Sequence, residues 1–164
     1  MTNTMELKVR RCLSELGVAY ELLPCDPELA DTAVFCEHYG YSLENSANAI
    51  LVTSKTGEKK YVACVLLAST RLDVNRTVRK RMGVRRLSFA SADETHCLTG
   101  MEIGGVTPIA LPHDLPLWVD ARVMARDYVI VGGGSRSCKV KVSPDLFKRT
   151  LNTDVVEGLA TEVS

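Results

Sequence analysis

Ala49-Ile-Leu-Val-Thr-Ser-Lys-Thr-Gly-Glu-Lys-Lys-Tyr-Val-Ala-Cys-Val-Leu-Leu67 is the stretch of this 164-residue chain that says most about its fold. Two runs of apolar and β-branched residues, 49–53 and 60–67, flank a polar segment, 54–59, that contains one glycine. Two such runs joined by a short polar segment predict a β-hairpin. We therefore expect a sheet to which this hairpin contributes two strands.

Helices and further strands are expected on both sides of this hairpin. Apolar spacing and capping residues predict helices over 6–16, 32–39, 74–82, 92–98 and 144–151. Further strands are expected over 18–23, 85–89, 117–120, 128–131 and 138–142, and the Gly- and Pro-rich segment 100–116 is expected to be irregular. Because hairpins and helices are mixed without regular β-α-β alternation, the predicted class is α+β (mixed α/β), with one sheet in a single domain, 1–164.

The composition is that of a folded chain and argues against a membrane protein. Hydrophobic residues make up 46% of the chain and charged residues 24%, which excludes a disordered composition. The 20 basic and 20 acidic residues balance, so the net charge neither favours nor excludes a nucleic-acid partner. The longest apolar run, 62–68, is too short to cross a membrane, and residues 1–11 lack the apolar core of a signal peptide. Six scattered cysteines are typical of reduced thiols, and we expect a cytoplasmic protein with no membrane partner.

The motifs of common hydrolases and metal sites are missing from the sequence. The chain has no Gly-x-Ser-x-Gly, His-Glu-x-x-His or P-loop motif. Its three histidines, His38, His96 and His113, are far apart, and its cysteines lack zinc-ribbon spacing. We therefore expect neither a metal site nor a cofactor.

The first candidate functional segment is Thr99-Gly-Met-Glu-Ile-Gly-Gly-Val-Thr-Pro108. Its glycines and Pro108 fix a loop whose backbone can approach a ligand closely. Consecutive main-chain N–H groups in such a loop can bind a carbonyl oxygen and stabilise a developing oxyanion. A tight connector with no ligand would explain the same composition.

Two further segments carry groups suited to nucleic acid. Val131-Gly-Gly-Gly-Ser-Arg-Ser137 lies between two expected strands and offers donors for a phosphate or a sugar hydroxyl, although it could be only a flexible hairpin. The segment 71–86 is strongly basic, and Arg76, Arg79 and Lys80 point away from the apolar edge of its expected helix. Such a face suits a phosphate backbone, but a solvated helix face gives the same pattern.

Taken in order, these segments resemble the YbaK/prolyl-tRNA-synthetase-associated family of editing domains over about residues 5–150. The matching pieces are Asp31-Thr-Ala33, Ser46-Ala-Asn-Ala-Ile-Leu-Val52, Asp73-Val-Asn75, Leu87-Ser-Phe-Ala-Ser91, Thr99-Gly100, Gly104-Gly-Val-Thr-Pro108, Trp118-Val-Asp120 and Gly132-Gly-Gly-Ser-Arg136. The resemblance implies a curved mixed sheet of about six to seven strands, partly barrel-like and flanked by helices, with a cleft for the tRNA 3′ end.

The resemblance also implies an activity. Members of this family hydrolyse the ester of mischarged tRNA, and the free-standing members act in trans, most often on alanine or cysteine attached to proline tRNA. The implied partners are mischarged tRNA and an aminoacyl-tRNA synthetase. A non-catalytic module that docks on tRNA or on a synthetase is the alternative, and a hydrolase of a free small ester is a third possibility.

The family comparison assigns roles to named residues. The catalytic loop is Gly104, Gly105, Val106, Thr107 and Pro108, and the backbone N–H groups of residues 104–107 are expected to bind the ester carbonyl oxygen. The expected substrate-binding residues are Thr32, Asn48, Asp127, Gly133, Gly134, Ser135 and Arg136. Many family members have a lysine where this chain has Asn48, so the resemblance implies an asparagine-bearing branch, in which this position is expected to bring no positive charge.

Overall fold

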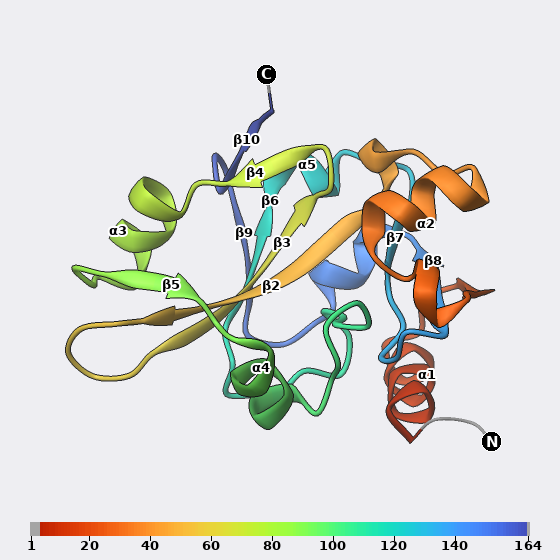
Figure 1. The fold of residues 1–164 in the computed structure, drawn as a ribbon, viewed down its shortest axis with the longest axis horizontal. Coiled ribbons are helices and arrows are strands. Elements are labelled where there is room, and N and C mark those ends of the chain that lie inside the picture. The colour runs from red at the N-terminus through yellow and green to blue at the C-terminus, as the bar shows by residue number, and fades with distance from the viewer. Residues whose placement is uncertain (1–3, 164) are drawn as a thin grey trace.

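The expected hairpin is the longest strand pair among the residues that the structure, a computed structural model, describes (4–163). Strand β2 (Ala47–Ser54) pairs antiparallel with β3 (Tyr61–Leu67), from Ala47 opposite Leu67 to Thr53 opposite Tyr61. The pair runs through the middle of the molecule (Figure 1). Residues 1–3 and 164 of the expected domain lie outside the described part.

Ten strands form three sheets within the described residues. The largest sheet is mixed: β5 (Leu87–Phe89), β2 and β3 are antiparallel, whereas β6 (Leu117–Asp120) and β9 (Thr153–Val156) continue it in parallel. The second sheet has the order β1 (Tyr20–Pro24), β8 (Cys138–Val142), β7 (Val129–Gly132), and the third pairs β10 (Ala160–Glu162) with β4 (Thr70–Leu72).

The mixed α/β class is confirmed, but the described strands do not close into a barrel. Among the described residues, the two larger sheets are joined by an isolated parallel bridge between Ser46 and Ile130, just before β2 begins, and by no continuous strand pair. The curved sheet expected from the family resemblance is therefore divided at this point.

Within the described residues, five α-helices and four 3-10 or π-helical segments surround the sheets (Figure 1). The α-helices are α1 (Thr4–Leu16), α2 (Thr32–Tyr39), α3 (Arg79–Met82), α4 (Ala92–Thr99) and α5 (Ala121–Met124), and the other segments are η1 (Pro27–Leu29), η2 (Leu43–Asn45), η3 (Val74–Val78) and η4 (Pro144–Lys148). The helix expected over 74–82 is a π-helix, η3, followed by the short α3. The helix expected over 144–151 is the 3-10 helix η4. Helix α2 has the predicted bounds and ends at Gly40, whose φ of 76° is left-handed.

The two faces of the β2–β3 hairpin bury two separate apolar clusters, because successive side chains point to opposite sides of a strand. Leu51 and Val65 belong to the first cluster, which α1 completes with Val9 and Leu13. The second cluster contains Val52, Val62, Cys64 and Leu66 from the hairpin, Val78 and Met82 from the basic segment, and Leu159 and Ala160 beside β10. The helix that carries the basic residues therefore covers one face of the hairpin only.

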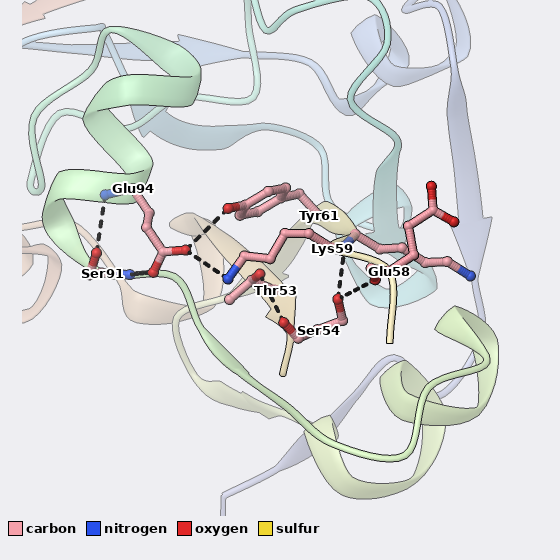
Figure 2. Close-up of polar contacts among 8 residues, drawn as sticks. Thr53, Ser54, Glu58, Lys59, Tyr61, Ser91 and Glu94 are labelled. Carbon is pink, nitrogen blue, oxygen red and sulfur yellow. Dashed lines mark hydrogen bonds and ion pairs between the residues drawn. The ribbon is translucent and has the colours of Figure 1, made fainter. Parts of the chain in front are cut away.

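Helix α4 is attached to the hairpin by a polar network around Glu94 (Figure 2). Ser91 Oγ accepts a hydrogen bond from the Glu94 amide at 3.1 Å, and the Ser91 amide donates to Glu94 Oε1 at 3.1 Å; the two bonds together form a capping box. Tyr61 Oη donates to Glu94 Oε2 at 3.2 Å, and Lys59 Nζ lies 3.5 Å from the same oxygen. The backbone hydrogen bond from Ser91, above all, lowers the pKa of Glu94. The start of α4 is thereby held beside the start of β3.

We expect Ser91→Ala to lower the free energy of unfolding by about 1 kcal/mol, because one N-terminal amide of α4 loses its cap. Ser14→Ala is the matched control: Ser14 is exposed within α1, where alanine is the better helix former. Urea denaturation measures both changes. Equal stability of the two variants would contradict the capping role.

Candidate active site

One pocket, with a volume of about 280 Å³, brings together α2, the start of β2, the 103–106 loop and the β7–β8 strands. Its walls are mostly apolar, with Phe35, Ile50 and Ile130 among them. Its polar or charged lining residues are Asp31, Thr32, Ser46, Asn48, Thr95 and Lys139, and the loop contributes Gly104 and Val106. Residues expected at the site from three separate parts of the sequence, Thr32, Asn48 and the 104–106 loop, thus meet here.

The loop amides fall into two kinds. The Gly105 amide donates to Glu102 O at 2.9 Å, and the Thr107 amide donates to Met101 Sδ at 3.5 Å. The amides of Gly104 and Val106 donate to no other described residue, and both residues line the pocket. The loop therefore offers two free main-chain donors at the pocket instead of four.

The other two loop residues, Thr107 and Pro108, do not line the pocket. Thr107 is fully buried, and its hydroxyl accepts a hydrogen bond from the Ile109 amide at 3.2 Å. Pro108 lines a different cavity, between α1 and the 110–115 segment. Gly105, Thr107 and Pro108 are therefore outside the pocket walls, and they shape the loop that presents its neighbours.

The glycine turn between β7 and β8 packs backbone to backbone against this loop. The Gly134 amide donates to Gly105 O at 3.0 Å. A Cβ atom at Gly132 would lie 2.2 Å from Val106 O, and one at Gly105 would lie 2.5 Å from the Ser135 carbonyl carbon. Glycine is required at both positions by this close approach. The expected binding residues Gly133, Gly134 and Ser135 do not line the pocket, and the turn supports the loop from behind.

Arg136 ties three segments together at the edge of the pocket. Its Nε donates to Pro27 O at 2.9 Å, and its Nη1 donates to Ile103 O at 2.9 Å and lies 3.4 Å from Asp31 Oδ1. Arg136 does not line the pocket. Its substrate-binding role stays a prediction, and the contacts present fix the start of α2 against the loop.

Thr32 and Asn48 form a pair on the pocket wall. Thr32 Oγ1 donates to Asn48 Oδ1 at 2.6 Å, so the Asn48 carbonyl oxygen is occupied. Asn48 Nδ2 makes no hydrogen bond to another described residue and remains a donor. The expected pair therefore presents an amide N–H, which suits a hydroxyl, carbonyl or phosphate oxygen.

Lys139 is a pocket residue that the sequence interpretation missed. It lies on β8, is only 7% exposed, and its ammonium stands 5.3 Å from the centre of the Phe35 ring. In Cys138-Lys-Val-Lys-Val142 the alternation of lysine and valine predicts lysines that face solvent. Helix α2 covers this face instead, and no local pattern could have indicated it.

Burial lowers the pKa of Lys139, and the charges around it do not restore it. Asp31, Cys25 and Cys36 act to raise this pKa, and Arg136 acts to lower it. Burial also raises the pKa of Cys25, so that thiol stays neutral beside the ammonium. The Lys139 ammonium makes no hydrogen bond or ion pair with any residue in the described part of the chain.

The other expected site residues lie elsewhere. Asp127 is exposed in the turn before β7. Arg76, Arg79 and Lys80 are exposed on η3 and α3, at the opposite side of the molecule from α2 (Figure 1). The structure therefore separates the basic face from the pocket.

Two features are absent from the described residues: a cluster of metal-binding side chains and a helix able to span a membrane. Residues 4–163 contain no group of three or more His, Cys, Asp or Glu side chains placed to hold a metal ion. No helix in the same range combines the length and apolar character needed to cross a membrane.

Comparison with known proteins agrees with the geometry. A family model described as an aminoacyl-tRNA editing domain matches residues 26–150. The Bacillus subtilis (strain 168) protein YwhH, described as uncharacterized, is 30% identical over 108 residues, so the match spans 66% of each chain, a little under two thirds of that relative.

Solved structures share the fold. The structure of the hypothetical protein APE2540 gives a TM-score of 0.82 at 27% identity, covering 94% of this chain and 99% of that chain. A structure described as a candidate trans-editing enzyme for prolyl-tRNA synthetase gives a TM-score of 0.81 at 19% identity, covering 99% of this chain and 100% of that chain. At that identity the second likeness shows the fold alone.

We expect Gly132→Ala to destabilise the protein by about 1–3 kcal/mol, because the new methyl group would overlap the Val106 carbonyl and push the loop away. Gly57→Ala is the control, since a Cβ there meets no atom within 4 Å and only its left-handed φ of 72° is strained, which costs about 1–2 kcal/mol. Denaturant titration gives both values. The loop displacement is tested by hydrogen exchange at Gly134, which should speed up only in Gly132→Ala.

We expect Lys139→Met to stabilise the protein most at neutral pH, where the native state must hold a buried ammonium without a partner. The folded-state pKa of Lys139 lies below its ordinary value of 10.5, so the unfolded chain binds more protons between the two values. Wild-type stability should therefore rise through this window, and the advantage of Lys139→Met should shrink as the pH approaches 10.5. Urea denaturation of the wild-type protein and of Lys139→Met, from neutral pH to about pH 10.5, measures this difference in unfolding free energy. Lys141→Met is the control on the same strand. A difference that does not change with pH would contradict a buried charge at Lys139.

Proposed function

The chain belongs to the aminoacyl-tRNA editing domain family, as the resemblance in its sequence predicted, and we propose that it acts in trans as a deacylase that hydrolyses the ester of mischarged tRNA. The observation that carries the proposal is the pair of free amides, Gly104 and Val106, at the wall of a pocket. Main-chain donors held in place before the reaction are the groups that stabilise an oxyanion without reorganisation.

In the proposed reaction, water adds to the ester carbonyl carbon and the carbonyl oxygen becomes an oxyanion that the Gly104 and Val106 amides bind. The C–O bond to the ribose then breaks, which releases the free amino acid and the ribose hydroxyl of the tRNA. Within the pocket lining there is no histidine. The neighbouring hydroxyl of the terminal ribose is therefore proposed to orient the water.

The Thr32–Asn48 pair is proposed to hold the terminal nucleotide. Asn48 Nδ2 is a free donor beside the amides, and Thr32 fixes its orientation through the 2.6 Å hydrogen bond. A small aminoacyl group such as alanine or cysteine suits a pocket of about 280 Å³ that must also receive the ribose. Proline tRNA is the proposed carrier, and the compartment is the one in which tRNA is charged, the cytoplasm.

The exposed Arg76, Arg79 and Lys80 are proposed to contact the tRNA backbone away from its 3′ end. Their helix lies across the molecule from α2, so these residues and the pocket would contact different parts of one tRNA (Figure 1). A synthetase that docks on the same face is a further partner consistent with the exposed charge.

We expect Val106→Pro to lower kcat by about 100- to 1,000-fold, because proline removes one of the two N–H donors. Val106→Ala, which keeps the amide and shortens the side chain, should retain most of the activity. Loss of the ester from alanine-, cysteine- and serine-charged tRNA measures turnover, and filter binding measures affinity for tRNA. Thermal denaturation checks that both variants are folded.

Three outcomes would contradict the proposal. If Val106→Pro were as active as Val106→Ala, the amide would have no catalytic role. If the wild-type protein bound tRNA but hydrolysed none of the three esters, it would be a docking module. Turnover of an amino-acid ester without tRNA, insensitive to salt, would instead indicate a hydrolase of free small esters.

A further inference from the structure

Lys139 enters the pocket from the sheet side. It pairs with Gly132 on β7 and with Leu23 on β1, and directly opposed residues of antiparallel strands point to the same face. Because Gly132 has no side chain, only the Leu23 side chain borders Lys139 across the sheet. The ammonium lies near the Phe35 ring of α2 and forms part of the pocket lining.

The charge of Lys139 is not neutralised within the described residues. The nearest acidic group among those that influence it, Asp31, has a side chain that is 68% exposed and pairs with Arg136. Cys25 is a neutral thiol, as described above, and the Cys36 thiol shares a hydrogen bond with Ser46 Oγ at 3.1 Å. The Phe35 ring makes a cation–π contact with the ammonium, but it carries no negative charge that could neutralise it.

The Lys139 side chain is largely buried, and its ammonium makes no hydrogen bond to another described residue, which destabilises the charged form in the native state; an apolar side chain of similar size would fit this face better. A ligand that brings an acceptor oxygen into the pocket would remove this penalty. We propose that Lys139 is the anion-binding residue of the pocket and that its ammonium pairs with an anionic oxygen of the bound ligand. The proposal rests on the proposed function for the identity of that ligand.

Two anionic oxygens could reach this position in a charged tRNA end. One is the phosphate on the 5′ side of the terminal adenosine, and the other is a carboxylate in the side chain of an acidic aminoacyl group. The Lys139 ammonium would bind either group through the same ion pair. Non-hydrolysable probes that carry only one of the two groups can distinguish between them.

The probes are amide analogues of charged adenosine: 3′-deoxy-3′-(L-alanylamino)adenosine, the same compound with a 5′-phosphate, and the L-aspartylamino compound. Calorimetry gives the Kd of each for the wild-type protein, for Lys139→Met and for Lys141→Met. Lys141 is the matched control because it lies two residues along β8 and stacks on Tyr128 outside the pocket.

We expect one of the two anionic probes to bind about tenfold or more tightly than the alanyl probe to the wild-type protein and to Lys141→Met. In Lys139→Met that gain should fall to about twofold or less. A gain for the phosphorylated probe identifies the nucleotide phosphate, and a gain for the aspartyl probe identifies a side-chain carboxylate. Absence of a gain with both probes, or a gain that survives in Lys139→Met, would overturn the proposal.

A second measurement keeps the test independent of the variant's folding. NMR of the wild-type protein with ¹³C-labelled lysine follows the Lys139 ammonium directly, and its pKa should rise when the favoured anionic probe binds. An unchanged pKa at saturation counts against the proposal. Neither readout needs turnover, so a protein without deacylase activity could still show the anion site, and an active deacylase could still lack it.

Discussion

The site depends on how closely two backbones approach each other. The 104–106 loop and the turn after β7 touch main chain to main chain, and no side chain fits between Gly132 and the Val106 carbonyl. The hydrogen bond from Gly134 to Gly105 fixes the two segments relative to each other. Gly105 is held in this way, and the amides of its neighbours Gly104 and Val106 donate to no other described residue. The glycine packing thus fixes the loop that carries these two amides.

The same pocket keeps groups that a purely structural core would have paired or replaced. Two main-chain amides, the Asn48 Nδ2 group and the Lys139 ammonium make no hydrogen bond to another described residue, whereas the neighbouring Thr32 and Arg136 are hydrogen-bonded. Free donors gathered in one pocket favour an oxygen-rich ligand. The engaged residues hold the walls at fixed separation, which keeps the donors in place before a ligand arrives.

Local signals predicted the elements well and the site in part. The hairpin, α2 with its Gly40 end and the Ser91–Glu94 capping box follow from turn and capping chemistry that the sequence displays directly. The glycines were recognised as important, but their role is mutual packing, which depends on partners about thirty residues away. Lys139 was missed because its strand alternates as an exposed strand does, and only the position of α2 buries it. The short strands β4, β9 and β10 were not predicted, since each contains polar residues and lacks the run of three apolar residues that marks β6 and β7.

The pairing of β4 with β10 sets an order on folding. Leu72 lies opposite Ala160, and the second apolar cluster needs Leu159 and Ala160 to close around Val78 and Met82. During synthesis the hairpin and the basic segment leave the ribosome well before these partners, so one face of β2–β3 stays uncovered for roughly half of the chain's translation. A nascent chain in this interval exposes valine-rich strand surface, and chaperone binding there would be governed by residues at the far end of the sequence.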